Sequence, residues 1–350
     1  MMIKILVTGG TGYIGSHTVV ALQEKGYKVI IADNLSNSNA DTIHAIAKIT
    51  GVKPELEVVD LSCKTACDDL FSRHSDLKAV IHFAAAKAVG ESVLQPLFYY
   101  ENNLCALLNV LQNMARIGCG NIVFSSSCTV YGQPKELPVQ ETSPRLPATC
   151  PYGNTKQIAE DILRDVAKAS LLGASPLALS VLALRYFNPI GAHSSALIGE
   201  LPNGVPNNLM PYITQTAAGL RSCLQVYGND YNTSDGTPIR DYIHVSDLAE
   251  AHLCAMEYLL SGKVKGIDYI NLGTGKGYTV LEVIQSFEKM SGIKLNYKIV
   301  ARREGDIEKI WGNVDKARQI LNWQAKREID EMTLSAWKWQ QYISTGLLDK

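Results

Sequence analysis

The chain alternates between short apolar runs and longer segments whose apolar positions recur with a helical period. Short apolar runs predict buried strands, and the helical period predicts amphipathic helices that cover them. Strands are expected at residues 3–7, 28–32, 55–59, 78–83, 121–125 and 179–186. Helices are expected between them, including 16–25, 96–117 and 152–170. Strands and helices that alternate in this way build a parallel sheet with helices on both faces, so the pattern predicts a Rossmann-type, doubly wound α/β fold.

The pattern changes after the last of these strands. Residues 188–240 are rich in Pro, Gly and Asn, which indicates loops and short elements that serve a binding lobe. The elements expected beyond this stretch are a helix at 246–260, a strand at 268–271 and a helix at 279–291. We therefore expect a nucleotide-binding domain over residues 1–187, to which segments near 241–275 return. Residues 188–350 are expected to form mainly a smaller, discontinuous α/β substrate-binding lobe.

A glycine-rich segment follows the first predicted strand directly. Strand 3–7 runs into Thr8-Gly9-Gly10-Thr11-Gly12-Tyr13-Ile14-Gly15, and a helix is expected immediately afterwards. Gly9 and Gly12 permit a tight turn and the close approach of a pyrophosphate to a helix N-terminus, and Gly15 lets the helix pack against the strand. A glycine run alone is weak evidence, but a strand before it and a helix after it indicate a dinucleotide-binding loop.

An acidic residue ends the second predicted strand. Asp33 follows strand 28–32 at about the 20-residue spacing at which a carboxylate accepts hydrogen bonds from the adenosine ribose. A carboxylate there repels the additional phosphate of NADP, and no Arg immediately follows to receive it. The alternative is an acid that only caps a helix or a turn. The position favours NAD as cofactor.

Tyr152 and Lys156 lie four residues apart at the start of a predicted helix. This spacing is one helical turn, so the phenol and the ammonium group project from the same face. A Lys about 5 Å from the phenol, at an effective dielectric of about 20, favours the phenolate by roughly 3 kcal/mol, or about two pKa units. A second positive charge, such as an oxidised nicotinamide ring, brings the Tyr closer to the range of a general base at neutral pH. The alternative is a chance pair on a surface helix.

Polar and small residues follow the carboxyl ends of the other predicted strands, where ligands bind in open α/β sheets. After strand 121–125, Ser127 is expected to donate to a substrate oxygen beside the Tyr, whereas Ser125 and Ser126 are expected to satisfy backbone groups. After strand 78–83, the small residues 84–86 allow a flat cofactor to lie against the backbone, and a cation, Lys87, follows them.

Composition narrows the class of protein. The chain has 350 residues, 46% of them hydrophobic, and a formal net charge of −1, which gives no field for nucleic acid or a membrane surface. The eight cysteines are scattered without a CxxC pair, which favours reduced thiols over disulfides. Cys63 and Cys67 are the closest pair, but no nearby pattern of further ligands indicates a metal site. No signal peptide or membrane-spanning run is recognised, so a cytoplasmic enzyme is expected.

Taken together, these motifs resemble those of the extended short-chain dehydrogenase/reductase family, and more narrowly its UDP-glucose 4-epimerases. The resemblance covers nearly the whole chain. The glycine loop and the Tyr152/Lys156 pair are typical of the superfamily, and other stretches are more specific. These are Lys87-Ala88-Val89-Gly90-Glu91-Ser92, Pro206-Asn207-Asn208-Leu209-Met210-Pro211, Arg240-Asp241-Tyr242-Ile243-His244-Val245 and Arg302-Arg303-Glu304-Gly305-Asp306.

The resemblance implies three groups of site residues. The implied catalytic residues are Tyr152, Lys156 and Ser127. The implied NAD contacts are Gly9, Gly12, Tyr13, Ile14, Gly15, Asp33, Asn34, Leu35, Ser36, Asn37, Ser38, Asp60, Leu61, Phe83, Ala84, Ala85, Lys87, Asn102, Tyr152, Lys156 and Phe187. The implied UDP-sugar contacts are Lys87, Ser127, Tyr152, Asn188, Asn208, Leu209, Tyr227, Arg240, Arg303 and Asp306. Tyr227 would stack on uracil and the arginines would bind the diphosphate. No metal is implied.

The implied activity is the interconversion of UDP-glucose and UDP-galactose by oxidation at C4, rotation of a 4-keto sugar and re-reduction, with NAD as cofactor. Activity on UDP-N-acetylhexosamines stays open. The family position that lines the hexose corresponds to Ile310, which is intermediate between a bulky Tyr that excludes an N-acetyl group and a small residue that admits it. UDP-galactose is the expected preference.

Three alternatives share these motifs. A nucleotide-sugar 4,6-dehydratase needs an acidic pair at positions that here hold Cys128 and Thr129. A UDP-hexuronate epimerase needs only altered contacts to the sugar, and a non-enzymatic NAD sensor would be marked by loss of Tyr152 or Lys156.

A homodimer is also implied. The resemblance implies it, and helices 96–117 and 152–170 carry apolar residues on more than one face. Together these predict a four-helix contact across a two-fold axis. The apolar residues that suggest it are Leu104, Leu107, Leu108, Leu111, Ile158, Ile162 and Val166.

Overall fold

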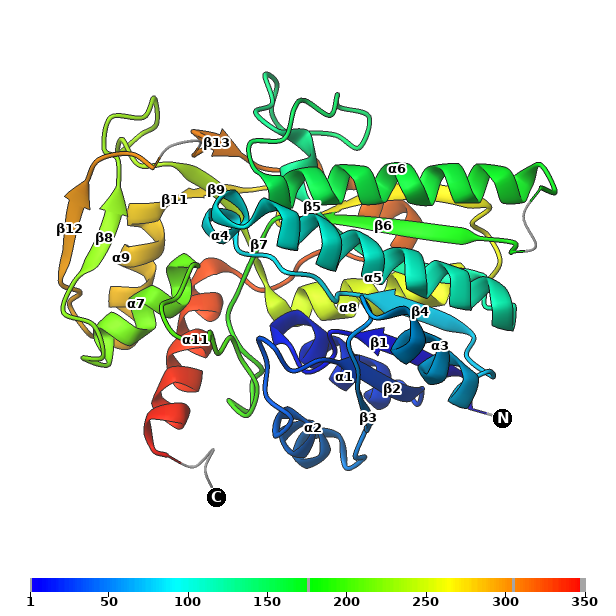
Figure 1. Cartoon of the computed structure of the whole chain (residues 1–350). Helices are drawn as coiled ribbons and strands as arrows, with labels where there is room; N and C mark the ends of the chain where they lie inside the picture. Colours follow the sequence, from blue (N-terminus) through cyan, green and yellow to red (C-terminus); the bar gives the residue numbers. More distant parts are fainter. Residues whose placement is uncertain (1, 175–176, 304–305, 347–350) are drawn as a thin grey trace.

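The computed structural model describes residues 2–174, 177–303 and 306–346, so Glu304 and Gly305 of the 302–306 motif lie outside the described residues. A parallel sheet with the strand order β10-β6-β5-β4-β1-β2-β3 forms its centre (Figure 1). Its strands are β1 (Lys4–Thr8), β2 (Lys28–Asp33), β3 (Glu55–Val58), β4 (Ala79–His82), β5 (Asn121–Ser127), β6 (Ser180–Tyr186) and β10 (Gly266–Leu272). The order reverses between β1 and β4, which is the point where ligands bind in doubly wound sheets.

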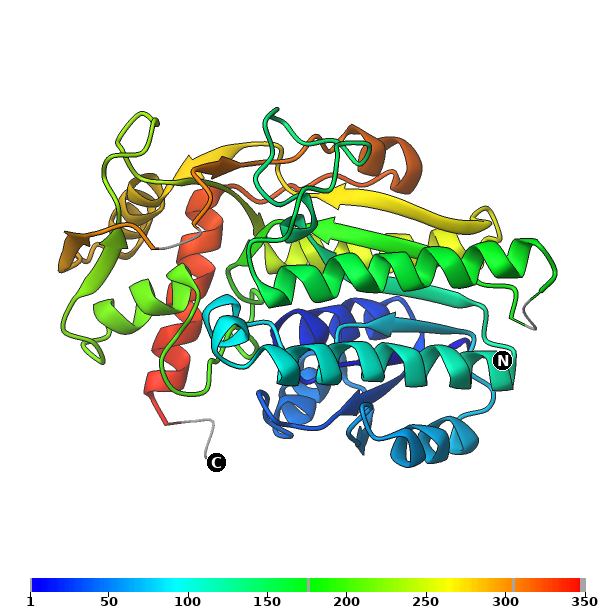
Figure 2. The same cartoon turned by 45° about the horizontal axis from the view of Figure 1, so that its top comes forward.

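Helices cover both faces of this sheet. The helices of one face are α1 (Tyr13–Glu24), α2 (Thr42–Thr50), α8 (Val245–Leu260) and α10 (Asp315–Leu321). Those of the other face are α3 (Lys64–Arg73), α5 (Pro96–Ile117) and α6 (Pro151–Leu171), and α5 and α6 run side by side in both views (Figures 1 and 2). Because side chains alternate along a strand, Ile5 and Val7 of β1 pack into the first core and Leu6 packs into the second. The predicted α/β class is confirmed.

A smaller lobe lies beyond the carboxyl edge of the sheet (Figure 1). Its sheet joins β7 (Asn188–Ile190), β9 (Ile239–His244), β11 (Gly277–Thr279) and β13 (Lys309–Ile310), and β8 (Leu224–Tyr227) pairs with β12 (Tyr297–Val300). Helices α7 (Leu209–Ala217), α9 (Val280–Ser291) and α11 (Ile329–Ser344) pack around a separate apolar core. Two short elements complete the fold: α4 (Val89–Leu94) contacts α5 and α6, and a 3-10 turn at Cys128–Tyr131 contacts α6 and β6. The chain returns from this lobe to the central sheet through α8 and β10.

Several predicted boundaries differ from the structure; the strand expected at 268–271, for example, spans Gly266–Leu272. The first helix begins at Tyr13 and not at residue 16, because Gly12 already serves as its N-cap. Strand β5 runs on to Ser127, because β6 continues to pair with it through Ser127 and Tyr186. All eight cysteines lie in the described part of the chain and carry free thiols. No described helix combines the length and apolar character that crossing a membrane requires.

Candidate active site

The glycine loop forms a backbone cradle between β1 and α1. Gly9 has a φ of +70°, and a Cβ built there would lie 2.9 Å from the Ala84 backbone nitrogen. A Cβ on Gly15 would lie 2.2 Å from the Gly9 carbonyl oxygen, so only glycine lets this turn and helix pack together. Gly12 is the N-cap residue of α1, and it has no side chain that could accept a hydrogen bond from the first N–H groups of the helix. The helix N-terminus is therefore open to an anionic group.

Asp33 lies at the end of β2, beside this loop, and is buried. Its Oδ1 accepts hydrogen bonds from the Leu35 backbone N–H at 2.9 Å and the Ser38 hydroxyl at 3.0 Å, and its Oδ2 accepts from the Thr11 N–H at 3.2 Å. The carboxylate thus stabilises the turn that follows β2, which is the role of a turn-capping acid. It also joins that turn to the glycine loop. It remains available as an acceptor because a carboxylate has about four lone-pair sites.

The other predicted cofactor contacts follow the carboxyl ends of neighbouring strands. Residues 34–38 come after β2, Asp60 and Leu61 after β3, and 83–87 after β4. Tyr13 is oriented by its hydroxyl, which donates to the Gly191 carbonyl at 2.6 Å, and Ile14 follows it in the first turn of α1.

Asn103 is a site residue that sequence reasoning missed. Its amide exchanges hydrogen bonds with the backbone of Ala86 and donates to the Thr155 hydroxyl at 3.1 Å. The predicted contact Asn102 is half-buried and donates to the Asn103 side chain at 2.9 Å. Asn103 therefore holds α5, α6 and the segment after β4 together. The sequence shows the adjacent pair Asn102 and Asn103, but α5 carries further asparagines, and only the structure shows that Asn103 is buried against the segment after β4.

Tyr152 and Ser127 are brought together at the edge of the sheet. Tyr152 lies in the first turn of α6, where Pro151 occupies the N-terminal position and the Cys150 thiol accepts from the Gly153 N–H. Burial raises the pKa of Tyr152 well above its ordinary value, and the Ser127 side chain, which also accepts from the Thr129 N–H at 3.2 Å, acts in the opposite direction. The serine thus favours the phenolate.

The expected effect of Lys156 on Tyr152 was overstated. Burial outweighs it, because desolvation disfavours the charged forms of both groups: it raises the pKa of Tyr152 and lowers that of Lys156 to about 8. The Lys156 Nζ donates to the Ser125 carbonyl at 2.7 Å and lies 5.9 Å from the centre of the Tyr152 ring. The two side chains share a face of α6, as the spacing predicted, but the lysine is anchored to β5.

Ser125 and Ser126 do not simply satisfy backbone groups at the strand end. The Ser125 hydroxyl lies 2.5 Å from the Tyr186 hydroxyl, and the Ser126 hydroxyl donates to the Glu160 carboxylate at 2.7 Å. Side chains from β6 and α6 compete successfully for these hydroxyls because both elements pack directly on β5. The interpretation of these two serines as backbone partners was wrong.

The predicted UDP-sugar residues lie on the smaller lobe and at its border. Arg240 Nη2 donates to the Asp306 carboxylate at 2.5 Å, and the Arg303 guanidinium lies 3.9 Å from the centre of the Tyr227 ring. Asn188 begins β7 and Leu209 begins α7. Each arginine is therefore held in place by another residue that is predicted to contact the UDP-sugar.

Glu200 is a second residue that the sequence did not reveal. It is half-buried, its carboxylate accepts from the Asn208 amide at 2.5 Å, and it lies 3.9 Å from the Lys87 Nζ. Burial raises the pKa of Glu200. The residue links Asn208 of the lobe to Lys87 of the nucleotide-binding part.

Ile310 is buried in a small apolar cluster next to the catalytic candidates. The cluster contains Val130, Tyr131, Val139, Phe187 and Ile310. Ile310 also pairs with Arg240 in the parallel register of β13 and β9. The position assigned to the hexose wall thus lies between the turn after Ser127 and the arginine expected at the diphosphate.

His244 and Asp241 have structural roles. The His244 Nδ1 accepts from the Ser246 N–H at 3.0 Å and caps α8. Asp241 is fully buried and accepts hydrogen bonds from the Thr274 and Gly275 backbone. Both groups stabilise the junction of the two parts of the molecule.

Comparison with known proteins adds independent information. Residues 6–335 match the family model described as GDP-mannose 4,6 dehydratase. The chain is 50% identical to the UDP-glucose 4-epimerase of Bacillus subtilis over 342 residues, which covers 98% of each chain. It is 47% identical to the UDP-glucose 4-epimerase of Mus musculus over 351 residues, with 99% of each chain covered.

Solved structures agree. A UDP-glucose-4-epimerase from Stenotrophomonas maltophila with bound NAD and formylated UDP-arabinopyranose superposes with a TM-score of 0.93 at 44% identity, covering 98% of this chain and 99% of that one. The enzyme from Bifidobacterium longum in complex with NAD+ and UDP gives the same TM-score, identity and coverage.

Proposed function

The chain belongs to the UDP-glucose 4-epimerase family of extended short-chain dehydrogenases/reductases, and from this premise we propose that it interconverts UDP-glucose and UDP-galactose with NAD as cofactor. The observation that carries the proposal is the placement of Tyr152 and Lys156 one turn apart on α6, with the Lys156 Nζ 5.9 Å from the centre of the Tyr152 ring and Ser127 at the end of the adjacent strand β5. This group lies at the carboxyl edge of the sheet that also carries the glycine loop.

The residues present fit NAD. The open N-terminus of α1 suits a pyrophosphate, and a side chain on Gly9 or Gly15 would fill the cradle. Asp33 presents a buried carboxylate suited to ribose hydroxyls. When bound, NAD supplies the acceptor and donor of the C4 hydride.

The protein's own residues move the proton. Ser127 and Tyr152 hold the sugar 4-hydroxyl between them, and the Tyr152 oxygen accepts its proton as C4 is oxidised. The same oxygen returns the proton to O4 when the 4-keto sugar, turned over, is reduced on its other face. Lys156 stabilises the phenolate form of Tyr152. The Ser127 side chain also favours that form.

The smaller lobe holds the UDP portion firmly so that the hexose can turn. We assign Arg240 and Arg303 to the diphosphate because guanidinium groups bind phosphate oxygens in pairs. Asp306 and Tyr227, which hold these arginines in place, belong to the same subsite, as do Asn188, Asn208 and Leu209. Binding energy supplied far from C4 can then orient the reacting carbon without fixing the sugar.

The test is turnover of UDP-galactose to UDP-glucose by the purified protein with bound NAD. We expect isomerisation without net consumption of NAD. A dehydratase, the activity in the description of the matching family model, would instead release a 4-keto-6-deoxy sugar. We do not expect that product, because Cys128 stands where the acid is needed and burial raises the pKa of its thiol to about 12. Bound NAD without turnover would indicate a sensor.

Substrate preference should depend on Ile310. We expect the protein to turn over UDP-galactose faster than UDP-N-acetylgalactosamine, because a buried Ile leaves less room than a small residue. Ile310→Ala should raise kcat/KM for the acetylated sugar by about tenfold, since a change of a few methylene groups in such a pocket is worth roughly 10- to 200-fold. The rate of the same variant on UDP-galactose is the control. Equal rates of the wild-type protein on both sugars would contradict this assignment.

We also propose that the protein is a cytoplasmic homodimer that pairs through α5 and α6. Leu108 is exposed, and Leu104, Ile158, Ile162 and Val166 are half-buried. Leu107 and Leu111 are not part of this surface, because they are buried in the core beneath α5. Light scattering should give the mass of a dimer at micromolar concentration, and Leu108→Glu should shift it toward the monomer. A monomeric wild-type mass would contradict the proposal.

A further inference from the structure

A buried ion pair lies directly beneath the turn that carries Tyr152 and Lys156. Glu160 is one turn after Lys156 on α6 and is fully buried. Its two carboxylate oxygens accept from Arg185 Nε at 2.8 Å and Nη2 at 2.7 Å, which is a paired, two-point contact. Neither the proton transfer nor the binding of substrate explains why a charged pair is kept here.

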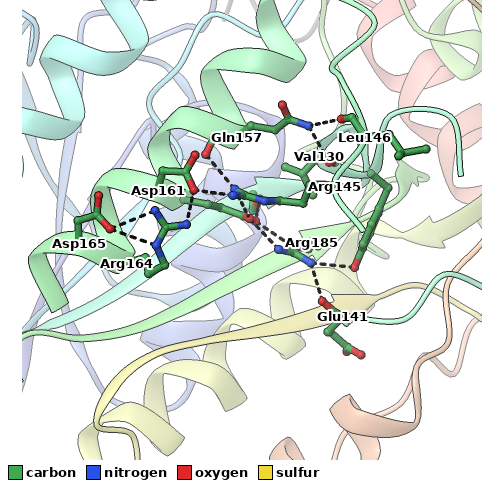
Figure 3. Close-up of polar contacts among 12 residues, drawn as sticks. Val130, Glu141, Arg145, Leu146, Gln157, Asp161, Arg164, Asp165 and Arg185 are labelled. Atoms are coloured by element: carbon green, nitrogen blue, oxygen red, sulfur yellow. Dashed lines mark hydrogen bonds and ion pairs between the residues drawn. The ribbon is translucent and has the colours of Figure 1, made fainter. Parts of the chain in front are cut away.

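Arg185 is fixed on every side. Its Nη1 donates to the Glu141 carbonyl at 3.0 Å (Figure 3). The same nitrogen donates to the Tyr131 hydroxyl at 3.2 Å, and the guanidinium lies over the rings of Tyr131 and Tyr269. Burial lowers the pKa of Arg185, but Glu160 outweighs this effect and holds that pKa above its ordinary value. The arginine therefore stays charged and keeps the Glu160 carboxylate in one position.

Glu160 and Lys156 attach α6 to consecutive residues of β5. The Lys156 ammonium donates to the Ser125 carbonyl at 2.7 Å, and the Ser126 hydroxyl donates to Glu160 at 2.7 Å. Two contacts one helical turn apart, made to neighbouring strand residues, fix the rotation and the height of α6 against the sheet. Tyr152 and Ser127 continue the same two elements, so this attachment also sets how they meet.

We propose that Glu160, held by Arg185 and Ser126, is a positioning residue for the Tyr152/Lys156 pair: it sets the placement of α6 on β5 and supplies the fixed negative charge that keeps Lys156 an ammonium ion. This inference rests on the proposed function, since it concerns the same proton-transfer group.

The groups that face Lys156 from the other elements do not supply that charge. On β4, burial lowers the pKa of His82 to about 3, so it is neutral at physiological pH. On β5, Lys156 meets the Ser125 carbonyl and the ring of Phe124, 4.9 Å away. On β6, Tyr186 is a neutral phenol whose pKa burial raises to about 12, and Arg185 is positive. Tyr152 is the remaining neighbour on α6.

The sign of the expected pH effect follows from Lys156. Burial lowers the pKa of Lys156 to about 8, and Glu160 opposes that lowering. Activity that needs the ammonium form is lost as pH rises through this pKa. Without the Glu160 charge the pKa falls further, so the loss begins at a lower pH.

The experiment compares Glu160→Gln with Asp165→Asn, which removes the same charge from an exposed position on α6. Asp165 pairs with Arg164 (Figure 3), whereas Arg145, the partner of the nearer Asp161, lies 3.6 Å from Glu160. We expect Glu160→Gln to move the basic limb of the pH profile of kcat/KM for UDP-galactose to lower pH by about one unit. Asp165→Asn should keep the wild-type limb.

Two further variants separate charge from attachment. The double variant Glu160→Gln/Arg185→Met removes both members of the ion pair, so neither charge is left buried without a partner. It replaces the single variant if that one does not fold, and the basic limb of its kcat/KM profile should also move to lower pH. Ser126→Ala keeps both charges, so it should keep the wild-type limb, while hydrogen exchange of the first turns of α6 should become faster by about tenfold.

The outcomes are distinct. A wild-type basic limb in folded Glu160→Gln or in the double variant would overturn the inference, as would unchanged hydrogen exchange in Ser126→Ala. Absence of UDP-galactose turnover in the wild-type protein would overturn the proposed function instead, and the exchange measurement, which does not depend on activity, would still test the attachment of α6.

Discussion

Replacing Tyr152 with Phe is expected to lower kcat by on the order of 10²- to 10⁴-fold, because it removes the oxygen that exchanges a proton with O4. The ring stays, so the packing of α6 should not change. Removal of the hydroxyl should lower the free energy of unfolding by no more than about 1 kcal/mol, the scale of one hydrogen bond. NAD should remain bound, since the glycine loop and Asp33 are untouched. Steady-state kinetics on UDP-galactose and the cofactor content of the purified variant measure both effects.

Two neighbouring substitutions show whether the residues act as a unit. Ser127→Ala should slow turnover less than Tyr152→Phe, because it removes one hydrogen bond and leaves the proton acceptor. Lys156→Ala should lower the rate and raise the pH at which Tyr152 ionises, since a positive charge beside the phenol is lost. If Tyr152→Phe kept more than about a tenth of the wild-type rate, Tyr152 would not be the proton-transfer residue.

The sequence predicted those elements whose ends carry their own chemical signals. The helix expected at 96–117 begins and ends at those residues, because Pro96 suits a first turn and Gly118, with a φ of +71°, ends it in the left-handed conformation. The first helix was placed too late because the glycine loop hides its start. Gly12 is already the N-cap, although glycines normally argue against a helix.

The site could be predicted in part for the same physical reason. Tyr152, Lys156 and Ser127 were recognisable from short spacings and strand ends. The pair of Glu160 and Arg185 was not, because its members lie 25 residues apart and a charged residue on a helix ordinarily faces solvent. Their burial depends on how α6 packs on β5 and β6, which no local pattern encodes. Glu200 was missed likewise, as its partners come from two separate segments.

Burial opposes the ionisation of Tyr152 that its spacing to Lys156 predicted. A pairwise estimate in a medium of uniform dielectric counts the attraction of Lys156 but leaves out the cost of removing both groups from water. In the structure that cost dominates and moves the two pKa values in unfavourable directions. Groups such as Ser127, whose side chain lowers the pKa of Tyr152, therefore contribute more than spacing alone suggests.

Gly15→Ala is expected to abolish tight binding of NAD. The new Cβ would lie 2.2 Å from the Gly9 carbonyl oxygen and 2.8 Å from the Gly10 Cα, and both are backbone atoms that no rotamer change can move away. The loop or the start of α1 must shift by about 1 Å, and a displacement of that size in a binding site costs on the order of 10²-fold. Overpacking should also lower the free energy of unfolding by about 1–3 kcal/mol.

Gly90→Ala is the matched control, because a Cβ there meets no atom within 4 Å and Gly90 lies in a helix, where Ala is the better residue. Titration calorimetry of the NAD-free proteins and thermal unfolding should separate the two variants clearly. Gly15→Ala should lose affinity and Tm, whereas Gly90→Ala should keep the affinity and unfold at the same or a higher temperature. If the Kd of Gly15→Ala for NAD stayed within about threefold of the wild-type value, the glycine loop would tolerate a side chain at this position. The dinucleotide would then have to bind without the close backbone approach that defines this loop.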